Sequence, residues 1–395
     1  MKKLILTFVA VMLTLVSVKA QSSLTTNESQ KTEAEAIIKR FMGDDSPLTV
    51  NVSISLTSDN GKDKFNYTLS GNTLNIEASS GVAACRGFYD FVKTNGAGIC
   101  SWTANRFDGE KALAATTTSR QLTSPYRDHQ YLNVVTYGYS MPYWNEARWD
   151  KELDWMALHG IDMPLMLLAS ESIYREVFKE EGVSEDDLNK WEVGPAHLPW
   201  MRMGNLAGNS FDGPLGQPWH DSQKRIAHHI LKRMAKLGMK PVVPAFGGFV
   251  PKACAEKLGA GNYSATGWNW VPQTYRNYRI TPAVPEFKKI GKRFIELWDK
   301  EFESSYGTFK YYLSDSFNEM DVPGDLDVLR NYGDQIYQAI IEGSQNPEAV
   351  WVTQGWEFVY GSGKWTNGAT TSSKYKALTQ DCAPHQFMSL YMAPE

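Results

Sequence analysis

The 395-residue chain lacks the residue patterns that mark a metal-binding or disulfide-rich protein. It has only 4 cysteines, and their spacing fits neither a zinc site nor a disulfide scaffold. We expect free, buried thiols, with a bridge between Cys85 and Cys100 as the alternative. The adjacent His228 and His229 face different sides of a helix and make a poor metal pair. The sequence therefore predicts no metal and no other cofactor.

The chain also has only a small excess of charge of one sign. The formal net charge is -4, and no block of like charges interrupts the chain. Nucleic acids and anionic membranes attract proteins through clustered basic residues, so we expect neither as a partner. Beyond the first twenty residues there is no second long apolar run, which argues against a membrane span.

The first twenty residues, "MKKLILTFVAVMLTLVSVKA", have two lysines directly after Met1, then an apolar run, and small residues at Val18 and Ala20. This order is typical of a bacterial export signal, which is removed from the mature protein. No cysteine follows the small residues, which argues against a lipid anchor. We therefore expect residues 1–20 to be a signal peptide and the protein to be exported, either to the periplasm or as a secreted protein.

Residues 21–125 show the periodicities of a small α+β domain. Helical spacing and period-two alternation follow each other, and a segment rich in threonine and serine then resembles a linker. The predicted segments are a helix at 32–43, strands at 48–56 and 65–78, a helix at 80–98 and a linker at 112–130.

Residues 126–395 alternate apolar strands with amphipathic helices. This alternation predicts a parallel sheet covered by helices. No glycine-rich phosphate turn follows the first strand, so a (β/α)8-type barrel is favoured over a nucleotide-binding sheet. Five strands can be assigned and a sixth is weaker, whereas a complete barrel has eight. The strands are predicted at 131–140, 161–170, 240–248, 311–319, 349–358 and, as the sixth, 386–392; the helices are predicted at 146–160, 170–182, 223–238, 285–302 and 326–343.

Polar and aromatic residues gather where these strands end. In a barrel the C-terminal strand ends form the active site, and a mouth of carboxylates, amides and aromatic rings suits a neutral, hydroxylated ligand such as a sugar. The residues at or just beyond the strand ends are Asn133, Tyr139, Glu171, Asn318, Glu319, Trp356 and Glu357. Glu171 has an alternative role at the N-terminus of the following helix, where acidic groups are favoured.

Glu319 is the strongest candidate for a catalytic carboxylate. Glycoside hydrolysis uses two carboxyl groups, about 5–5.5 Å apart for retention and about 6.5–9.5 Å apart for inversion. Asp315 lies on the same strand face, but four residues of strand would separate the two by roughly 13 Å. We therefore expect Asp315 to be a buried, hydrogen-bonded support residue, and the partner of Glu319 to come from another strand.

The chain resembles the α-N-acetylglucosaminidase family, relatives of the lysosomal enzyme that trims heparan sulfate. The resemblance runs in order from about Tyr131 to Phe358 and rests on "YLNVVTYGYSMPYWNEARWDKELDWMALHGID", "GPAHLPWMRMGNL", "FDGPLGQPWH", "KPVVPAFGGFVP", "DSFNEM" and "AVWVTQGWEF". The N-terminal module is similar to the small domain that precedes the barrel in that family.

The resemblance implies removal of terminal α-linked N-acetylglucosamine with retention, with Glu319 as general acid/base and no cofactor. A glycan ending in this sugar would be the partner; the oligomeric state is left open. The positions that the family uses to line the sugar pocket correspond to Asn133, Tyr139, Trp200, Met203, Trp268, Tyr312, Asn318 and Trp356. For Trp200, Trp268 and Trp356, packing between domains is the alternative.

The resemblance also implies that the family's second catalytic glutamate and its helical C-terminal domain lie beyond the matched region. Our hypothesis is that the chain is a fragment or the product of a prematurely ended reading frame, poorly stable and close to inactive alone. Two alternatives stay open: a noncatalytic sugar-binding fragment and a different retaining glycosidase.

Overall fold

The structure is a computed structural model, and it describes residues 24–359, 365 and 369–390. The expected signal peptide at 1–20 lies outside these residues. In the described part of the chain, no helix combines the length and apolar character that a membrane span requires. The same part contains all four cysteines as free thiols, so Cys85 and Cys100 are not bridged.

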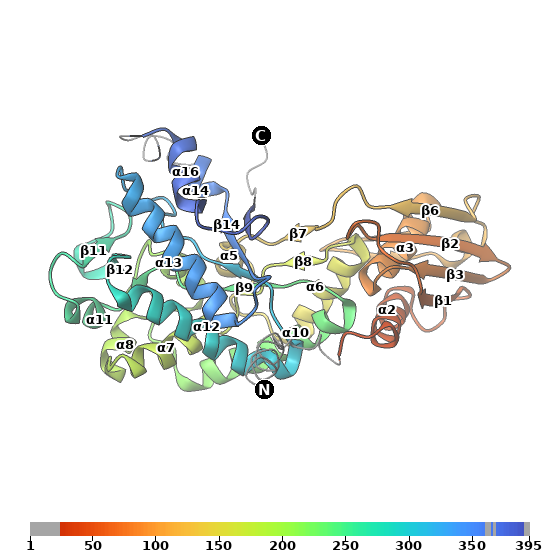
Figure 1. Cartoon of the computed structure of the whole chain (residues 1–395). Coiled ribbons are helices and arrows are strands. Elements are labelled where there is room, and N and C mark those ends of the chain that lie inside the picture. Colours follow the sequence, from red (N-terminus) through yellow and green to blue (C-terminus); the bar gives the residue numbers. More distant parts are fainter. Residues whose placement is uncertain (1–23, 360–364, 366–368, 391–395) are drawn as a thin grey trace, which may run out of the picture.

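The N-terminal residues form a small α+β unit, on the right in Figure 1. Its four-stranded sheet has the order β1-β3-β2-β6, in which β1 and β3 are parallel and the other neighbours antiparallel. Side chains of Thr26 and Ser80 cap the two main helices by accepting backbone N–H groups that would otherwise lack a partner. The elements are α2 (Asn27–Met42), β1 (Thr49–Ile54), β2 (Lys64–Ser70), β3 (Thr73–Ala78), α3 (Gly81–Thr94), β4 (Gly98–Cys100), β5 (Asn105–Phe107), α4 (Gly109–Leu113) and β6 (Ser119–Thr123).

The segment predicted as a linker is partly structured. Residues Ser119–Thr123 form β6, which pairs antiparallel with β2 at the edge of the sheet. This edge strand is mostly exposed and therefore lacks the buried alternation by which a strand is recognised in a sequence.

The remaining residues form the incomplete (β/α) barrel that the sequence predicted. Six described strands run parallel in chain order: β7 pairs with β8, an isolated bridge between Leu165 and Val242 joins β8 to β9, and β9, β13, β14 and β15 follow side by side. The weakly predicted sixth strand is confirmed as β15. The strands are β7 (Gln130–Tyr131), β8 (Met163–Pro164), β9 (Val242–Pro244), β13 (Tyr311–Leu313), β14 (Val350–Gln354) and β15 (Phe387–Leu390).

Long helices cover the outside of these strands (Figure 1). All five predicted barrel helices are present, and α6 and α10 end at Gly160 and Gly238, which adopt the left-handed backbone that glycine tolerates. The helices are α5 (Thr136–Tyr139), α6 (Glu146–His159), α7 (Ser170–Glu180), α8 (Glu185–Trp191), α9 (Leu198–Arg202), α10 (Gln217–Leu237), α11 (Lys252–Lys257), α12 (Pro285–Tyr306), α13 (Leu326–Ser344), α14 (Trp356–Val359) and α16 (Thr371–Thr379).

The barrel strands are shorter than predicted. The apolar run at 131–140 contributes only Tyr131 to β7, and its end turns into α5; the run at 311–319 contributes only Tyr311–Leu313 to β13. Most residues that follow these two strands are buried or half-buried, with Tyr139 and Ser140 as exposed exceptions, so apolar character continues where strand pairing has ended. Burial, rather than strand geometry, explains the length of those runs.

A small antiparallel sheet that the sequence did not predict follows β9. It has the order β10-β12-β11, and its strands are β10 (Phe249–Val250), β11 (Tyr263–Thr266) and β12 (Asn277–Ile280). The connection between β11 and β12 carries Trp268 and Trp270. The segment between β11 and β12 therefore places two tryptophans at the barrel mouth.

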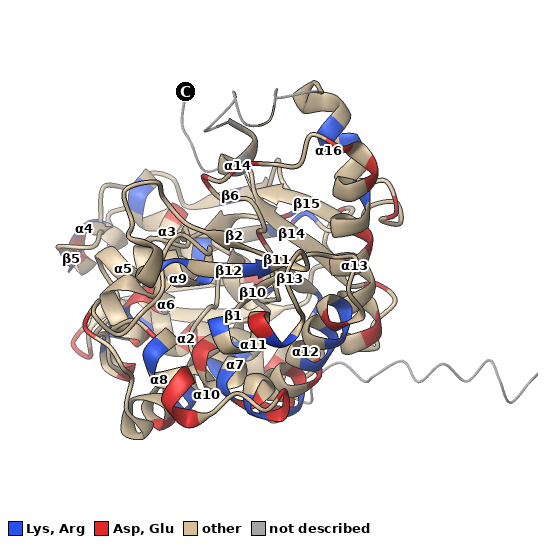
Figure 2. Cartoon of the chain, turned by 90° about the vertical axis from the view of Figure 1, so that its left-hand side faces the viewer, with Lys and Arg blue, Asp and Glu red and all other residues tan. Residues whose placement is uncertain are grey.

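Charged residues of both signs are interspersed along the outer helices (Figure 2). Many of them join neighbouring helices as ion pairs, for example Arg293 to Glu180 at 2.7 Å and Lys288 to Glu342 at 2.9 Å. Such exposed pairs each contribute roughly 0–1 kcal/mol, so the helices are held mainly by their buried apolar faces.

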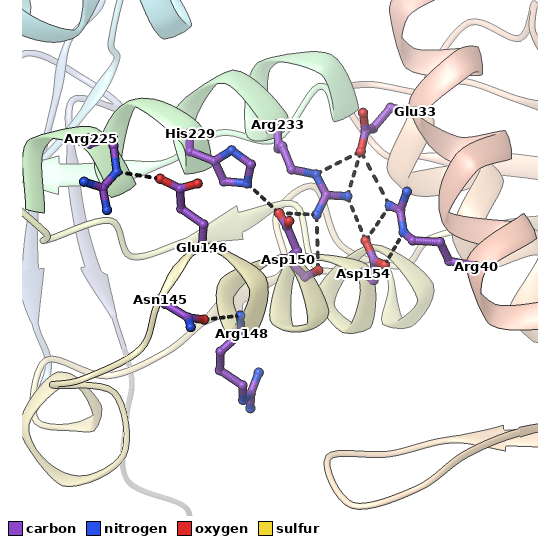
Figure 3. Close-up of polar contacts among 10 residues, drawn as sticks. All are labelled: Glu33, Arg40, Asn145, Glu146, Arg148, Asp150, Asp154, Arg225, His229 and Arg233. Carbon is purple, nitrogen blue, oxygen red and sulfur yellow. Dashed lines mark hydrogen bonds and ion pairs between the residues drawn. The ribbon is translucent and has the colours of Figure 1, made fainter. Parts of the chain in front are cut away.

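A more buried network joins the small unit to the barrel (Figure 3). Arg233 of α10 contacts Glu33 of α2 at 2.6 Å, and Asp150 and Asp154 of α6 at 2.9 and 2.7 Å. Arg40 of α2 adds a pair with Asp154 at 2.8 Å. The guanidinium of Arg233 thus links three helices from the two parts of the molecule.

Candidate active site

A cavity of about 570 Å³ lies at the C-terminal ends of the barrel strands. Its walls come from the segments after β7, β13 and β14, from α9 and from the segment between β11 and β12. Its position matches the barrel end at which active sites form. The lining residues are Asn133, Val135, Tyr139, His197, Trp200, Met203, Leu206, Phe211, Trp268, Trp270, Asn318, Glu319, Gln354 and Trp356.

Glu319 lies in this cavity with its carboxylate held by two indole groups. Trp268 donates its Nε1–H to Oε2 at 2.8 Å, and Trp356 donates its Nε1–H to Oε1 at 3.0 Å. Glu319 also has a φ of 53°, which is unusual for a residue other than glycine. Strained backbone of this kind persists where surrounding contacts enforce it, often at functional sites. The two tryptophans therefore orient the carboxylate from separate parts of the chain.

Asn318 is held by a second asparagine, which the sequence reasoning missed. Asn318 donates its side-chain N–H to Oδ1 of Asn205 at 3.2 Å, and Asn205 donates to the backbone carbonyl of Asn318 at 3.1 Å. The backbone carbonyl of Asn205 also accepts the N–H of Trp268 at 3.3 Å. Asn205 is fully buried and connects the Glu319 turn to the Trp268 segment. A single asparagine inside an apolar motif gives no sequence signal for this role.

Asp315 does not line the cavity itself but holds Gln354, which does. It accepts hydrogen bonds from the Thr353 hydroxyl at 2.5 Å, and from the backbone N–H and side-chain amide of Gln354 at 2.8 and 2.5 Å. Burial raises the pKa of Asp315 above its ordinary value, and these hydrogen bonds only partly oppose the shift. The amide of Gln354 also contacts the Met203 sulfur at 3.4 Å. The prediction of Asp315 as a buried support residue is confirmed.

A line of four aromatic rings forms one wall of the cavity. Tyr139 meets Trp200 edge to face at 5.2 Å between ring centroids, Trp200 lies 6.5 Å from Trp268, and Trp268 stacks on Trp270 at 5.1 Å. Aromatic rings present broad apolar faces, whereas their hydroxyl and N–H groups can bind polar atoms. This wall suits a ligand that has an apolar face and polar edges.

Most of the predicted site residues line this one cavity. Those that do so are Asn133, Tyr139, Trp200, Met203, Trp268, Asn318, Glu319 and Trp356. Val135 also lines the cavity, at a position that the resemblance gives to the pocket wall; the lining residues that the prediction omitted are His197, Leu206, Phe211, Trp270 and Gln354. Most of the omitted residues are apolar or lie outside the barrel strands, so neither polarity nor strand position marked them.

Tyr312 is the exception, and its prediction as a sugar-pocket residue is wrong. Its side chain is fully buried and points to α12, where its hydroxyl donates to the Asp299 carboxylate at 3.0 Å. Burial and the Asp299 charge raise the pKa of Tyr312 well above its ordinary value. Tyr312 therefore fixes β13 to its covering helix.

Glu171 does not line the described cavity, and it lies at the N-terminus of the following helix, as its alternative role predicted. It lies in the first turn of α7, but its carboxylate binds Arg202 of α9 in a two-pronged ion pair with distances of 2.7 and 3.0 Å. Both charges are buried, so the pair holds α9 in a defined orientation. Since α9 also carries Trp200, Glu171 positions the aromatic wall indirectly.

Among the residues whose side chains the structure describes, Glu319 supplies the only carboxylate that lines the cavity. The described residues also contain no group of three or more histidines, cysteines or acidic residues that could hold a metal. What the described cavity offers is one oriented carboxylate, several amides and an aromatic wall. The carboxyl group can give a proton to a bound neutral ligand or take one from it, and the amides can form hydrogen bonds with the ligand.

Comparison with protein families gives two matches. The α-N-acetylglucosaminidase (NAGLU) TIM-barrel domain matches residues 129–382, and the N-terminal domain of the same family matches residues 32–113. Human α-N-acetylglucosaminidase is 33% identical over 331 residues, which cover 82% of this chain and 43% of the human protein. The chain thus spans less than half the length of this relative.

Solved structures share the fold. A family 89 glycoside hydrolase from Clostridium perfringens in complex with PUGNAc is 24% identical, with a TM-score of 0.76 over 92% of this chain and 39% of that chain. In complex with GlcNAc-α-1,4-galactose, described as its substrate, a variant of the Clostridium perfringens protein gives a TM-score of 0.77 over 93% of this chain and 40% of that chain. At this identity the likeness shows the fold alone.

Proposed function

Because this chain belongs to the α-N-acetylglucosaminidase family, we propose that its cavity binds terminal α-linked N-acetylglucosamine and that Glu319 is the general acid/base for cleavage of the glycosidic bond. The observation that carries the proposal is the Glu319 carboxylate, held at 2.8 and 3.0 Å by Trp268 and Trp356 inside the cavity. A general acid must be aimed at the atom that it protonates, and these two contacts restrict its orientation.

The chemical step divides between two carboxyl groups. A general acid gives its proton to the oxygen that leaves with the second sugar, and the same group later removes a proton from water. In a retaining mechanism a second carboxylate, about 5–5.5 Å away, attacks the sugar carbon from the opposite side. We propose that Glu319 carries the first role. Since no other carboxylate lines the described cavity, we expect the 395-residue chain to bind the sugar but hydrolyse it poorly.

The deciding experiment compares binding and turnover in the purified chain. Titration of N-acetylglucosamine should quench the fluorescence of the cavity tryptophans, and a chromogenic α-N-acetylglucosaminide should be hydrolysed slowly at most. Any turnover should fall by about 10²–10⁴-fold in Glu319→Gln, because the amide cannot donate and recover a proton as a carboxyl group does. Glu348→Gln is the matched control, since Glu348 is exposed just before β14, at the opposite end of the barrel strands.

Each outcome separates the candidates. Absence of sugar binding would refute the assignment of the cavity. Rapid hydrolysis by the wild-type chain would refute the expectation of poor turnover, and preference for a β-linked substrate would favour a different retaining glycosidase.

A noncatalytic sugar-binding role is the second candidate, and the single carboxylate in the described cavity favours it. Under this role Glu319 would only accept hydrogen bonds from sugar hydroxyls. Binding in Glu319→Gln equal to that in the wild type, with no turnover in either protein, would support it. We also propose that the protein is exported, on the basis of the composition of residues 1–20.

A further inference from the structure

Trp270 is an exposed tryptophan at the edge of the cavity. Its exposed fraction is 69%, although it lines the cavity and stacks on Trp268 with an interplanar angle of 18°. An exposed aromatic ring at the edge of a cavity presents an apolar face that a ligand in the cavity can reach. The outer ring face has the size and apolar character to cover one face of a sugar.

The backbone on either side of Trp270 is held in place. Arg276 donates to the Val271 carbonyl at 3.1 Å and to the Asn269 carbonyl at 3.4 Å, and the Val271 N–H donates to the Trp268 carbonyl at 3.0 Å. These contacts restrain the residues before and after Trp270. A restrained ring loses less conformational entropy when a ligand stacks on it, which favours binding.

The position of Glu319 sets the direction in which a leaving group departs. A general acid contacts the oxygen that joins the bound sugar to the leaving group. Glu319 accepts the indole N–H of Trp268, and Trp270 is the next ring outward in the aromatic line. A leaving group that departs on the Trp268 side of Glu319, rather than on the Trp356 side, would meet the ring of Trp270.

We propose that Trp270 is the platform of an outer subsite, which binds the second sugar of the glycan by stacking on one face of its pyranose ring. This inference rests on the proposed function, because it assumes that the terminal sugar occupies the cavity beside Glu319. Because of this stacking, the chain is expected to have a higher affinity for a disaccharide than for a monosaccharide.

The test measures the affinity of the purified chain for N-acetylglucosamine and for GlcNAc-α-1,4-galactose by calorimetry. The wild type should bind the disaccharide about tenfold more tightly, and Trp270→Ala should remove most of this difference. Trp270→Phe should keep a large part of it, because a smaller aromatic face remains. Trp102→Ala is the matched control: Trp102 is 65% exposed, but it lies between β4 and β5 in the small unit.

The outcomes separate the outer subsite from the proposed function. Equal affinities of the wild type for the two ligands would overturn the subsite and leave the proposed function standing. Equal weakening of both ligands by Trp270→Ala would show that Trp270 only supports Trp268, and would also overturn the subsite. A wild-type chain that binds neither ligand would overturn the proposed function together with this inference.

Discussion

At the residue scale, the Glu319 turn depends on contacts with residues far away in the chain. Asn205 lies 113 positions before Asn318, yet the two side chains share a hydrogen bond at 3.2 Å in the protein interior. Loss of one partner leaves the other buried and unsatisfied, which costs about 1–3 kcal/mol. Asn205 is therefore expected to position Glu319 without touching a ligand itself.

Asn205→Ala should lower the free energy of unfolding by about 1–3 kcal/mol and weaken sugar binding, because the Glu319 turn loses both hydrogen bonds to the Asn205 side chain, whereas the backbone contact with Trp268 remains. Denaturant unfolding and fluorescence titration would measure the two effects. Asn51→Ala is the control, since Asn51 and Asn75 form a similar side-chain pair at 3.0 Å on an exposed sheet surface. Equal effects of the two substitutions would contradict the role of Asn205.

Asp315 predicts a pH dependence of stability. Its pKa is raised in the folded protein, so the folded state holds this proton more tightly than the unfolded chain does. The contribution of Asp315 to stability is therefore greatest below the ordinary Asp pKa of about 3.9, and it falls as the pH rises through the folded pKa. Asp315→Asn should remove this dependence, so the variant should gain stability relative to the wild type as the pH rises from about 4 to 7.

Urea unfolding at several pH values would measure this difference. Asp381→Asn is the control: the hydrogen bond from Arg330 holds the pKa of Asp381 below its ordinary value, so Asp381 is ionised in both states above about pH 5. The effect of Asp381→Asn should then be constant from about pH 5 to 7. A constant effect of Asp315→Asn from pH 4 to 7 would contradict the role given to burial.

At the element scale, close helix packing governs the C-terminal part of the barrel. A Cβ atom added to Gly333 of α13 would lie 1.7 Å from the backbone carbonyl oxygen of Leu378 in α16. This approach is possible only because glycine has no side chain at the contact. The position of α16 beside β15 therefore depends on Gly333.

Gly333→Ala should destabilise the protein by about 1–3 kcal/mol, because the helices must move apart and the higher helix propensity of alanine only partly compensates. The melting temperature would measure this loss. Gln338→Ala on the same helix, at a partly exposed position, should change stability by less than about 0.5 kcal/mol. A stabilised Gly333→Ala variant would show that α16 is not packed as described.

Strand alternation shows which site residues were predictable. Side chains along a strand alternate between its two faces, so residues an odd number of positions apart face opposite sides. Since Asp315 was expected inside the barrel, the same rule puts Tyr312 outside, against the helices. The resemblance had placed Tyr312 in the pocket, and the alternation would have corrected it. No comparable rule applies to the segment between β11 and β12, because it is not part of a barrel strand.

At the scale of the whole molecule, Arg233 connects the small unit to the barrel. Burial alone would lower the pKa of Arg233, but the charges of Asp154 and Glu33 outweigh this and raise it. Burial would likewise raise the pKa of Asp150, but hydrogen bonds from His229 and Arg233 hold it below its ordinary value. The network is thus stable only while positive and negative members are both present.

Arg233→Met should lower the free energy of unfolding by about 3 kcal/mol, because it leaves partly buried carboxylates without their common partner. Arg225→Met on the same helix is the control: the Arg225 side chain is 67% exposed, and its pair with Glu146 should contribute less than about 1 kcal/mol. Figure 3 shows the contacts of both arginines, and denaturant unfolding would measure the two losses of stability.

The pH dependence of this effect follows from Asp150. Because its folded pKa is depressed, its contribution to stability is present above the ordinary Asp pKa and is lost as the pH falls through the folded value. The difference between the wild type and Arg233→Met should therefore shrink below about pH 4. A difference that stays constant into acid would show that packing, rather than charge, accounts for the loss.

The sequence by itself determined the five long barrel helices, the parallel barrel, and the place of Asn133, Asn318 and Glu319 beyond the ends of barrel strands, since periodicity and strand direction are local properties of the chain. Only the tertiary structure decided which groups meet there. The indole of Trp268 reaches Glu319 across 51 positions, from a loop between two antiparallel strands. The path of such a loop depends on packing against the rest of the molecule, and no local pattern encodes it.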